Sequence, residues 1–584
     1  MPTLVGAVLR IARVVVDVTG VDKPFDYLIP DELAPQVVVG ARVRVPLHRR
    51  EVPGWVMEVL DADRSDVDVA RLLPIRKVTS IGPAPDVVEL AEWAAVRWAS
   101  RRRPFFVAAS PTKRVPRLGS PQRRAGRPAE HDSSMASLLD GPGGLVVMGP
   151  ADSPMPLIRA AILHGPTLVV VPTLSRARRI AAECRRLGCT TASYPDDWAA
   201  GASGVDVVIG ARSAVWATVP GLAAIVVVDE HDDVLQEERA PTWHARDVAI
   251  ERARRSGIPC LLASAVPTLA ARRWADTRVV DDGDARAWPT IRVIDRNADE
   301  RWASSLVTSV LIQLLRDHDK RVVCVLNVKG RARAVACDSC RSVARCEHCD
   351  AGLSQPAKDR LSCPRCGAER PVVCLGCGSQ KFRSIRAGIS RLRDEMEAAA
   401  GRVVQEVTPT TESLDPAASV FVGTEAVLHR LDRADSVVFL DIDAELLAPR
   451  YRASEQTLDL IAHGARLVAP TAHADGGEVV LQTAVPNHEL ITGLVAGDLS
   501  AHIAAETARR ERLRLPPFGA LAEISGPGTK EAVEVLSASL LVEVAAREDS
   551  ALVRAASWDD LSSALAMLPR TKQRIRVSVD PSRV

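Results

Sequence analysis

The sequence lacks any run of the roughly 18 or more apolar residues that a membrane-spanning helix needs. Its first residues carry charge without a small-residue cleavage site, which argues against a secretory signal. It also has no short-period repeat and little net charge, +2 over 584 residues. These absences exclude a helical membrane protein, a secreted precursor and a repeat array. We therefore expect a soluble, cytoplasmic chain of three or four globular domains.

The small net charge hides an uneven distribution. Residues 1–130 hold 21 Lys/Arg against 15 Asp/Glu, and residues 329–393 hold 14 against 5, so the rest of the chain carries about −13. Basic surfaces on an acidic body are typical of nucleic-acid-binding proteins, and here they predict a nucleoid-associated chain. The alternative is an Arg-rich codon bias that scatters basic residues without a function.

The pattern of the chain changes along its length. Residues 8–60 alternate apolar and polar positions between Gly and Pro, as in a small β-rich unit, and residues 86–100 have helical spacing. Residues 101–134 are rich in Arg and predict a mobile basic linker. From residue 145, apolar runs such as TLVVVP, AIVVVDE and CLLAS alternate with helical stretches, and a second set (VVCVLN, SVFVG, SVVFLDID, VVLQT) follows. Two doubly wound parallel sheets in tandem are predicted.

Eight cysteines form the strongest chemical signal. They occur as four Cys-x-x-Cys pairs, the spacing that lets one tight turn direct two thiolates at the same ion. A disulfide framework is the alternative, but a cytoplasmic chain keeps its thiols reduced, so we predict two structural zinc sites of four cysteines each. Cys184, Cys189, Cys260 and Cys324 lie in apolar segments and are expected in the core. The paired cysteines are Cys337/Cys340, Cys346/Cys349, Cys363/Cys366 and Cys374/Cys377.

One stretch begins like a phosphate-binding P-loop and does not continue as one. Residues 145–157 read LVVMGPADSPMPL, an apolar strand followed by a glycine and a helix. No Gly-Lys-Ser/Thr follows Gly149, and that lysine and hydroxyl are the groups that bind phosphate and magnesium.

The order of these motifs resembles one family over nearly the whole chain. The motifs are FDYLIP, VVVGARVRVP, VPTLSRAR, VIGARSAVWA, VDEHDDVLQEERAPTWHARDVAI, LNVKGRA, the eight cysteines, VFVGTEAVL, LDIDAELLAPRYRASEQTLDLI, RLRLPPFGALA and RIRVSVDPSRV. The chain is similar to bacterial primosomal protein N-prime, the PriA family of replication restart proteins, as a divergent, actinobacterial-like member with degenerate helicase motifs.

This resemblance implies a multidomain α/β fold with a small N-terminal β-rich DNA-binding domain, two RecA-like helicase lobes with an inserted double zinc-binding module, and an α+β C-terminal domain. A basic linker replaces the family's winged helix, and Arg101–Arg127 takes over part of its DNA contacts. The predicted domains are 1–100 (binding of a DNA 3′ end), 101–140 (basic linker), 141–300 (lobe 1), 301–336 (start of lobe 2), 337–380 (zinc-binding insertion, the cysteine module below), 381–483 (rest of lobe 2) and 484–584 (C-terminal domain).

The resemblance also implies how the zinc sites are paired and where the motor residues lie. Cys337, Cys340, Cys374 and Cys377 would hold one zinc ion, and Cys346, Cys349, Cys363 and Cys366 the other. The P-loop pattern of the family, laid on Gly149, places Asp152, Pro154, Met155 and Pro156 at its later positions, with Met155 for the lysine and Pro156 for the hydroxyl. The family's Asp-Glu-x-His falls on Val228, Asp229, Glu230 and His231, and a deletion of one residue brings Asp229 and Glu230 back into register. The family's Gly-Arg-Ala-Gly-Arg motif aligns with Val468, Ala469, Pro470, Thr471 and Ala472 of this chain.

The N-terminal motif is better preserved. Phe25, Asp26, Tyr27 and Gly40 match the family's 3′-end pocket, in which an aromatic ring stacks on the terminal base and a carboxylate reads the 3′-hydroxyl. A lysine of the family is Leu73 here, which puts a phosphate contact in doubt. The alternative is that Phe25 and Tyr27 belong to the core of the β unit.

Three functions follow from these patterns. The first is a factor that binds stalled or abandoned forks and promotes reloading of the replicative helicase without an ATPase or helicase activity of its own, so that no catalytic residue is assigned. The second is an active ATP-dependent 3′–5′ DNA helicase with divergent motifs, and the third is a zinc-dependent assembly module. The expected cofactors are two zinc ions. The expected partners are forked DNA, DNA 3′ ends, single-stranded DNA-binding protein and the replicative helicase with its loader, and the chain is expected to be a monomer.

Overall fold

The computed structural model describes most of the chain. The described residues are 10–61, 68–123, 137–281, 288–298, 306–326, 335–340, 342–348, 351–357, 359–363, 367–384, 389–408, 410–411, 413–468, 477–547, 549–568, 574–582 and 584. Among these residues, no helix combines the length and the hydropathy that crossing a bilayer requires.

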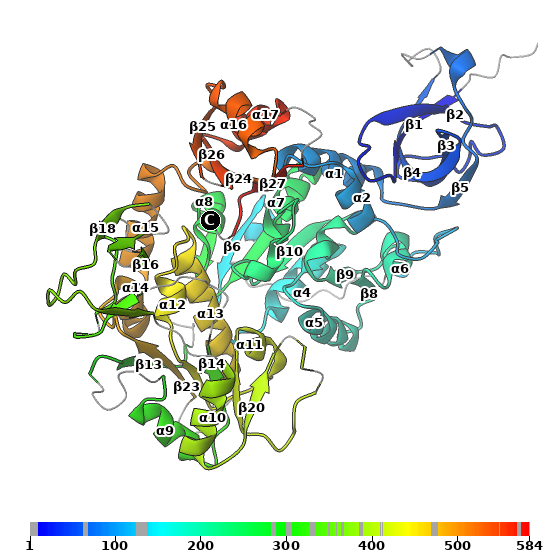
Figure 1. Cartoon of the computed structure of the whole chain (residues 1–584). Helices are drawn as coiled ribbons and strands as arrows, with labels where there is room; N and C mark the ends of the chain where they lie inside the picture. Colours follow the sequence, from blue (N-terminus) through cyan, green and yellow to red (C-terminus); the bar gives the residue numbers. More distant parts are fainter. Residues whose placement is uncertain are drawn as a thin grey trace, which may run out of the picture.

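The N-terminal unit is an antiparallel sheet followed by two helices (Figure 1). Its strands have the order β2-β1-β4-β3-β5, and their alternating burial gives one face to a core that includes Val14, Tyr27 and Val43. The predicted helix is α1, which starts at Pro85 and buries positions three and four residues apart. The bounds are β1 Arg10–Val16, β2 Pro24–Leu28, β3 Arg42–Leu47, β4 Arg50–Asp61, β5 Lys77–Ser80, α1 Pro85–Arg97 and α2 Arg103–Ala109.

The prediction of a mobile linker from residue 101 onward is wrong for its first part. Residues Arg103–Ala109 form helix α2, and Phe105 and Phe106 are fully buried. The neighbouring arginines are used internally, because Arg102 pairs with Asp22 at 3.2 Å and Arg103 with Asp17 at 2.6 Å. Apolar burial by two phenylalanines outweighs the basic flanks. These two arginines are therefore held by the N-terminal unit, and residues 124–136 of the predicted linker lie outside the described residues.

Lobe 1 is a seven-stranded parallel sheet in the order β12-β6-β11-β10-β7-β9-β8. Its central strands are buried along their whole length, as expected for parallel strands covered by helices on both faces. The predicted strands of this sheet are confirmed. The bounds are β6 Gly143–Val147, α4 Met155–His164, β7 Thr167–Val170, α5 Leu174–Arg186, β8 Thr191–Tyr194, α6 Trp198–Ser203, β9 Val207–Gly210, β10 Ala224–Val228, α7 Ala245–Ser256, β11 Cys260–Ser264, α8 Leu269–Ala275 and β12 Val279–Asp281.

Lobe 2 repeats this architecture with six parallel strands in the order β13-β23-β22-β14-β21-β20. It lies below lobe 1 in Figure 1, and helix α13 runs between the two sheets. The bounds are β13 Thr290–Asp295, α9 Ser309–Arg316, β14 Val322–Val325, α10 Ile389–Ala400, β20 Val404–Val407, β21 Val420–Gly423, α11 Ala426–Arg430, β22 Ser436–Phe439, α12 Asp443–Leu446, α13 Ala453–Val468 and β23 Glu478–Thr483.

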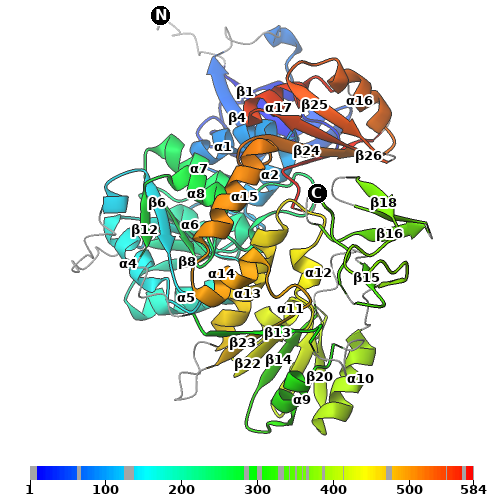
Figure 2. The same cartoon turned by 90° about the vertical axis from the view of Figure 1, so that its left-hand side faces the viewer.

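The cysteine module interrupts lobe 2 between β14 and α10 and projects from it (Figure 2). It contains two small antiparallel sheets, and the Gly352 N–H donates to the Leu447 carbonyl at 2.9 Å to join it to lobe 2. The bounds are β15 Val335–Cys337, β16 Ser354–Ala357, β17 Arg360–Ser362, β18 Glu369–Pro371 and β19 Phe382–Ser384.

The C-terminal domain has a four-stranded antiparallel sheet in the order β25-β26-β24-β27. It packs on lobe 1 and on α1, where Arg97 lies 3.6 Å over the Trp558 ring, so one hydrophobic core runs through all three units. Both views place this domain beside α1 (Figures 1 and 2). The bounds are α14 Glu489–Ala496, α15 Ser500–Arg512, β24 Ala520–Ser525, α16 Thr529–Ser537, β25 Val542–Ala546, β26 Ser550–Ala555, α17 Trp558–Ala566 and β27 Arg576–Val579.

Candidate functional sites

The loop after β6 has the position of a P-loop but binds its own side chain. The Gly149 N–H, which would face a phosphate, donates to Asp152 Oδ2 at 2.5 Å. The Met155 N–H donates to Ser153 Oγ at 3.3 Å, and Pro154 and Pro156 have no N–H to offer. A carboxylate therefore occupies the place of an anion at the start of α4.

The side chain that replaces the P-loop lysine points away from the cleft. Met155 is 4% exposed and packs in the hydrophobic core under α4. The apolar character of Met places it in that core, where a lysine would have to reach toward the phosphates. The described part of this loop therefore offers no cation to a nucleotide.

Asp229 and Glu230 follow directly after β10, and Val228 is the last residue of that strand and is buried. Glu230 is fully buried and accepts hydrogen bonds from the Thr268 N–H at 2.8 Å and the Thr268 hydroxyl at 2.9 Å. It also pairs with Arg246 of the HARDVAI motif at 3.2 Å. The sequence left open whether Val228 or Asp229 stands where the family has its aspartate. In the structure the Val228 side chain is buried in the strand, and Asp229 is the first residue beyond it.

Two arginines hold Asp229, one from its own lobe and one from lobe 2. Arg176 of α5 lies 3.1 Å from Asp229 Oδ2, and Arg466 of α13 lies 2.7 Å from Oδ1. Arg466 also donates to the Pro150 carbonyl at 2.9 Å and so joins lobe 2 to the P-loop position. Burial alone would raise the pKa of Asp229, but the two arginines outweigh it and the pKa lies below its usual value.

Arg466 is the functional residue that the sequence comparison missed. The resemblance aligns the motif that holds the family's arginines with Val468, Ala469, Pro470, Thr471 and Ala472. Only Val468 of these is described, and it is the buried last residue of α13. The other four lie outside the described residues. Arg466 precedes that motif by a fraction of a helical turn. An arginine on the same helix, close to the aligned motif, was the sequence feature that could have identified it.

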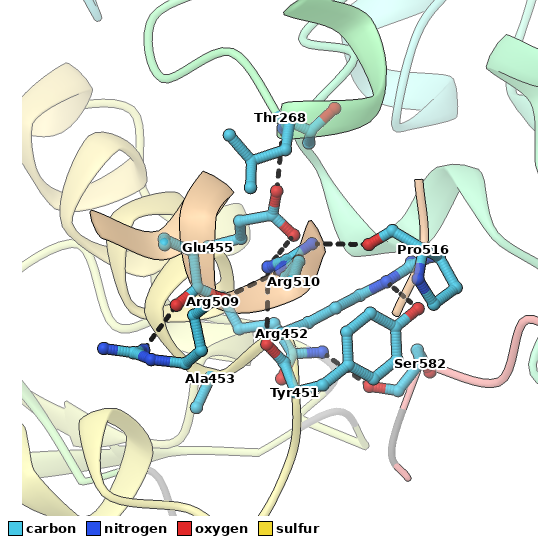
Figure 3. Close-up of polar contacts among 12 residues, drawn as sticks. Thr268, Tyr451, Arg452, Ala453, Glu455, Arg509, Arg510, Pro516 and Ser582 are labelled. Atoms are coloured by element: carbon cyan, nitrogen blue, oxygen red, sulfur yellow. Dashed lines mark hydrogen bonds and ion pairs between the residues drawn. The ribbon is translucent and has the colours of Figure 1, made fainter. Parts of the chain in front are cut away.

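A polar hub joins the two lobes to the C-terminal domain (Figure 3). Arg510 of α15 is 2% exposed and pairs with Glu455 of α13 at 2.9 Å and with Glu506 at 2.8 Å. Glu455 accepts in turn from the Leu269 N–H of lobe 1 at 2.8 Å. The Arg510 guanidinium also donates to the Tyr451 and Pro516 carbonyls, each at 3.3 Å. These contacts of Arg510 and Glu455 therefore connect lobe 1, lobe 2 and the C-terminal domain directly.

The described cysteines gather as the family pairing predicts for the first site. Cys337 Sγ lies 3.5 Å from Cys377 Sγ, and Cys340 Sγ lies 3.4 Å from Cys374 Sγ. The four sulfur atoms all lie within 4.8 Å of one another. Thiolates about 2.3 Å from one tetrahedral zinc lie roughly 3.8 Å apart, so these four residues suit a zinc ion. Gly378, with φ of 75°, forms the tight turn after one pair.

The second zinc site is described only in part. Cys346 and Cys363 are buried side by side in the small core of the cysteine module, while Cys349 and Cys366 lie outside the described residues. Gly367 follows this half of the module with φ of 74°. Among the remaining cysteines, Cys184, Cys260 and Cys324 are fully buried, as predicted, and Cys189 is half-buried.

The predicted 3′-end residues lie on β2 and at a turn beside it. Tyr27 is 4% exposed and its hydroxyl donates to the Pro46 carbonyl at 3.0 Å, so its ring belongs to the core, as the alternative interpretation holds. Phe25 is half-buried on the same face. Asp26 points to the other face and pairs with Arg13 at 3.0 Å.

Gly40 and Leu73 complete the predicted pocket. Gly40 has φ of 86°, and a Cβ there would lie 1.7 Å from the Pro83 carbonyl oxygen, so the fold itself requires glycine. Leu73 is 52% exposed, and its carbonyl accepts from the Leu28 N–H of β2 at 3.0 Å. Leu73, which the resemblance aligns with the family's lysine, therefore lies beside β2 and has an apolar side chain.

Comparison with known proteins finds one matching domain and several similar chains. Residues 13–111 match the family described as the 3'DNA-binding domain (3'BD) of PriA. The replication restart protein PriA of Bacillus subtilis (strain 168) is 29% identical over 368 residues, which are 58% of this chain and 45% of that protein. The probable replication restart protein PriA of Mycobacterium tuberculosis (strain ATCC 25618 / H37Rv) is 28% identical over 565 residues, 87% of this chain and 85% of that protein.

Solved structures are more remote. The structure titled S. cerevisiae Dbp5 bound to RNA and ADP BeF3 covers 74% of this chain and 98% of its own, with 10% identity and a TM-score of 0.36, too low for any inference. The chain thus contains a match to the 3'DNA-binding domain of PriA at residues 13–111 and is similar, over most of its length, to replication restart proteins named PriA.

Proposed function

We propose that this chain is a replication-restart factor that binds stalled or abandoned forks and promotes reloading of the replicative helicase without hydrolysing ATP. The N-terminal match to a 3'DNA-binding domain and the relatives named replication restart protein PriA support the DNA-binding half of this proposal. The partners expected for the family, single-stranded DNA-binding protein and the replicative helicase with its loader, are part of the same proposal, as are a monomeric state and a location at the cytoplasmic chromosome.

The contacts of Asp152 and Asp229 support the second part of the proposal, that the chain acts without hydrolysing ATP. The Gly149 N–H binds Asp152, and both oxygens of Asp229 face arginines. Phosphate binding would require Asp152 to leave the loop, and magnesium binding would require Asp229 to leave Arg176 and Arg466. Neither lysine nor hydroxyl is present at Met155 and Pro156 to stabilise the new arrangement.

We expect no DNA-stimulated ATP turnover and no strand separation. Purified full-length protein is assayed for phosphate release with and without forked DNA, and turnover on the order of 1 s⁻¹, within the ordinary enzyme range, would contradict the proposal. A contaminating ATPase is recognised with Asp229→Asn, because only turnover that this variant loses belongs to the cleft.

One observation favours the alternative of an active helicase. Arg176 and Arg466 bring two positive charges to the cleft, and arginines that reach the γ-phosphate contribute roughly 10³-fold or more to phosphoryl transfer. In that case nucleotide binding would break the Asp229 pairs, and Arg466→Ala would lower turnover. The same ATPase assay therefore separates the two functions.

Recognition of a DNA 3′ end is tested with Phe25, the half-buried aromatic of β2. We expect Phe25→Ala to weaken binding by about 1–3 kcal/mol, the range for base stacking, but only on forks with an exposed 3′ end. Fluorescence anisotropy is measured on forks whose 3′ end is free, blocked or absent. Tyr27→Phe is the control, because it removes the bond to Pro46 and keeps the buried ring.

Equal affinity of the wild type for the three forks would show that no 3′-end pocket operates here. Absence of DNA binding to any of them would favour the third function, a zinc-dependent assembly module.

A further inference from the structure

A second polar cluster lies across the cleft, separate from the cysteine module. His231 and Asp232 come from the loop after β10 in lobe 1, and Asp459 and His463 lie one helical turn apart on α13 in lobe 2. All four side chains are buried, with 1% of His231 and Asp232 and 5% of Asp459 and His463 exposed. Two imidazoles and two carboxyl groups are thus buried together between the lobes.

Three of the four side chains direct one atom each toward the others. His463 Nε2 lies 3.2 Å from Asp232 Oδ2 and 3.1 Å from Asp459 Oδ1, and these three atoms all lie within 4.8 Å of one another. His231 Nε2 lies 3.8 Å from Asp459 Oδ1, beside this group of three. The arrangement is a close group of one nitrogen and two oxygen donors with a second imidazole nitrogen next to it.

These four atoms are also the ones that lack hydrogen bonds. Among the described residues, none of His231 Nε2, Asp232 Oδ2, Asp459 Oδ1 and His463 Nε2 has an aligned hydrogen-bond partner. The contacts at 3.1 and 3.2 Å have the distance of a hydrogen bond but not its direction. Buried polar atoms are nearly always paired, so four such atoms in one buried cluster indicate a missing common partner.

His231 and Asp232 are each hydrogen-bonded to a neighbouring residue through the ring or carboxylate atom that does not face the cluster. His231 Nδ1 lies 2.7 Å from Ser264 Oγ, and Asp232 Oδ1 accepts from the Val234 N–H at 2.9 Å. Metal-ligating imidazoles and carboxylates are commonly oriented in this way by a second hydrogen bond on the side away from the ion. His231 and Asp232 therefore each have one atom satisfied by the protein and one atom directed into the cluster.

We propose that His231, Asp232, Asp459 and His463 bind one divalent transition-metal ion, of the zinc class, that joins lobe 1 to lobe 2. Imidazole and carboxylate donors suit such ions, and four protein ligands make a closed structural site. Two buried carboxylates carry the charge that balances a divalent cation. His231 also lines a cavity of about 320 Å³ between the lobes and the C-terminal domain, which gives the ion a route inward.

The ion would lie beside the place where a motor of this architecture holds its nucleotide. It would fix the two lobes relative to each other independently of ATP, together with the Arg466 contacts across the same cleft. The inference rests on the four side chains and stands apart from the proposed function. The competing arrangement is a protonated His463 held between Asp232 and Asp459 with no metal.

The test compares the metal content of full-length proteins purified without chelator. We expect Asp459→Asn/His463→Gln to contain about one equivalent less divalent metal than the wild type, while the zinc bound by cysteines is unchanged. His429→Gln is the matched control, because its ring lies 4.7 Å from that of His463 but outside the four ligands. Equal metal content in the wild type and the double variant would overturn the proposal.

A measurement on the wild type alone keeps the proposal testable if the double variant fails to fold. Crystals of the wild type are examined by anomalous diffraction on both sides of the zinc edge, without added metal and with one equivalent of ZnCl₂. The expected peak lies about 2.0–2.2 Å from the four donor atoms. A map without a peak there in both crystals would establish the metal-free imidazolium arrangement.

Discussion

Removal of zinc is expected to unfold the cysteine module while the lobes and the N-terminal unit stay folded. The core of the module is small and includes two of the paired cysteines, Cys346 and Cys363. So small a core seldom holds a fold without metal or disulfides. Structural zinc sites contribute about 10–16 kcal/mol of apparent binding energy at pH 7, more than such a core can replace. Limited proteolysis with and without a strong chelator, with zinc release followed by a colorimetric dye, measures the effect.

The cysteine prediction has a matched pair of variants. Cys374→Ala removes one of the four gathered thiolates and should release zinc and expose the module to protease. Cys189→Ala removes a half-buried thiol of lobe 1 and should change neither. Acid acts in the same direction as the chelator, because protons compete with zinc for the thiolates. Metal analysis that finds no zinc, or a module that stays protease-resistant without it, would contradict two zinc sites of four cysteines.

The parallel sheets were predictable because their chemistry is local. The run TLVVVP became β7 with every residue buried, as continuous apolar strands in a helix-covered sheet require. Strand β8, with the sequence TASY, carried no such signal, since only alternate residues are buried. Helix α2 was not predicted because its first residue and the two residues before it are arginines, although the proline in its first turn and two adjacent phenylalanines indicate a buried helix.

The contacts across the cleft could not be predicted in the same way. Arg466, Asp459 and His463 are visible as one face of a helix, but their partners Asp229 and Asp232 come from the other lobe and meet them only through tertiary packing. The family pattern places Asp152 and Met155 in the P-loop from the sequence alone. It could not show that the Asp152 carboxylate accepts the hydrogen bond of the Gly149 N–H, because that contact depends on the folded loop.

The second large effect is expected at the hub in Figure 3, where Arg510→Met should destabilise the protein by about 3–5 kcal/mol. Arg510 is 2% exposed, and its loss removes the ion pair of the partly buried Glu455 and one of the two ion pairs of the buried Glu506, which keeps Arg509 at 2.5 Å. Thermal or urea unfolding of the full-length chain measures the change. Arg512→Met on the same helix is the control, because Arg512 is exposed and its change should stay within about 0.5 kcal/mol.

The pH dependence of that difference tests its electrostatic origin. Burial raises the pKa of Glu455. Arg510 and Arg452, together with the hydrogen bonds that Glu455 accepts, lower it by more, so the pKa lies below its usual value. Such a group stabilises the folded state above its unfolded pKa of about 4.3, and this contribution is lost as the pH falls toward the folded pKa. The gap between wild type and Arg510→Met should therefore be widest at neutral pH and narrow below about pH 4.3. Adding Glu455→Gln to Arg510→Met should restore part of the stability at pH 7, since the unpaired charge is removed. A gap that stays constant with pH, with no gain from Glu455→Gln, would mean that Arg510 acts through packing alone and that the lobes are held together by other contacts.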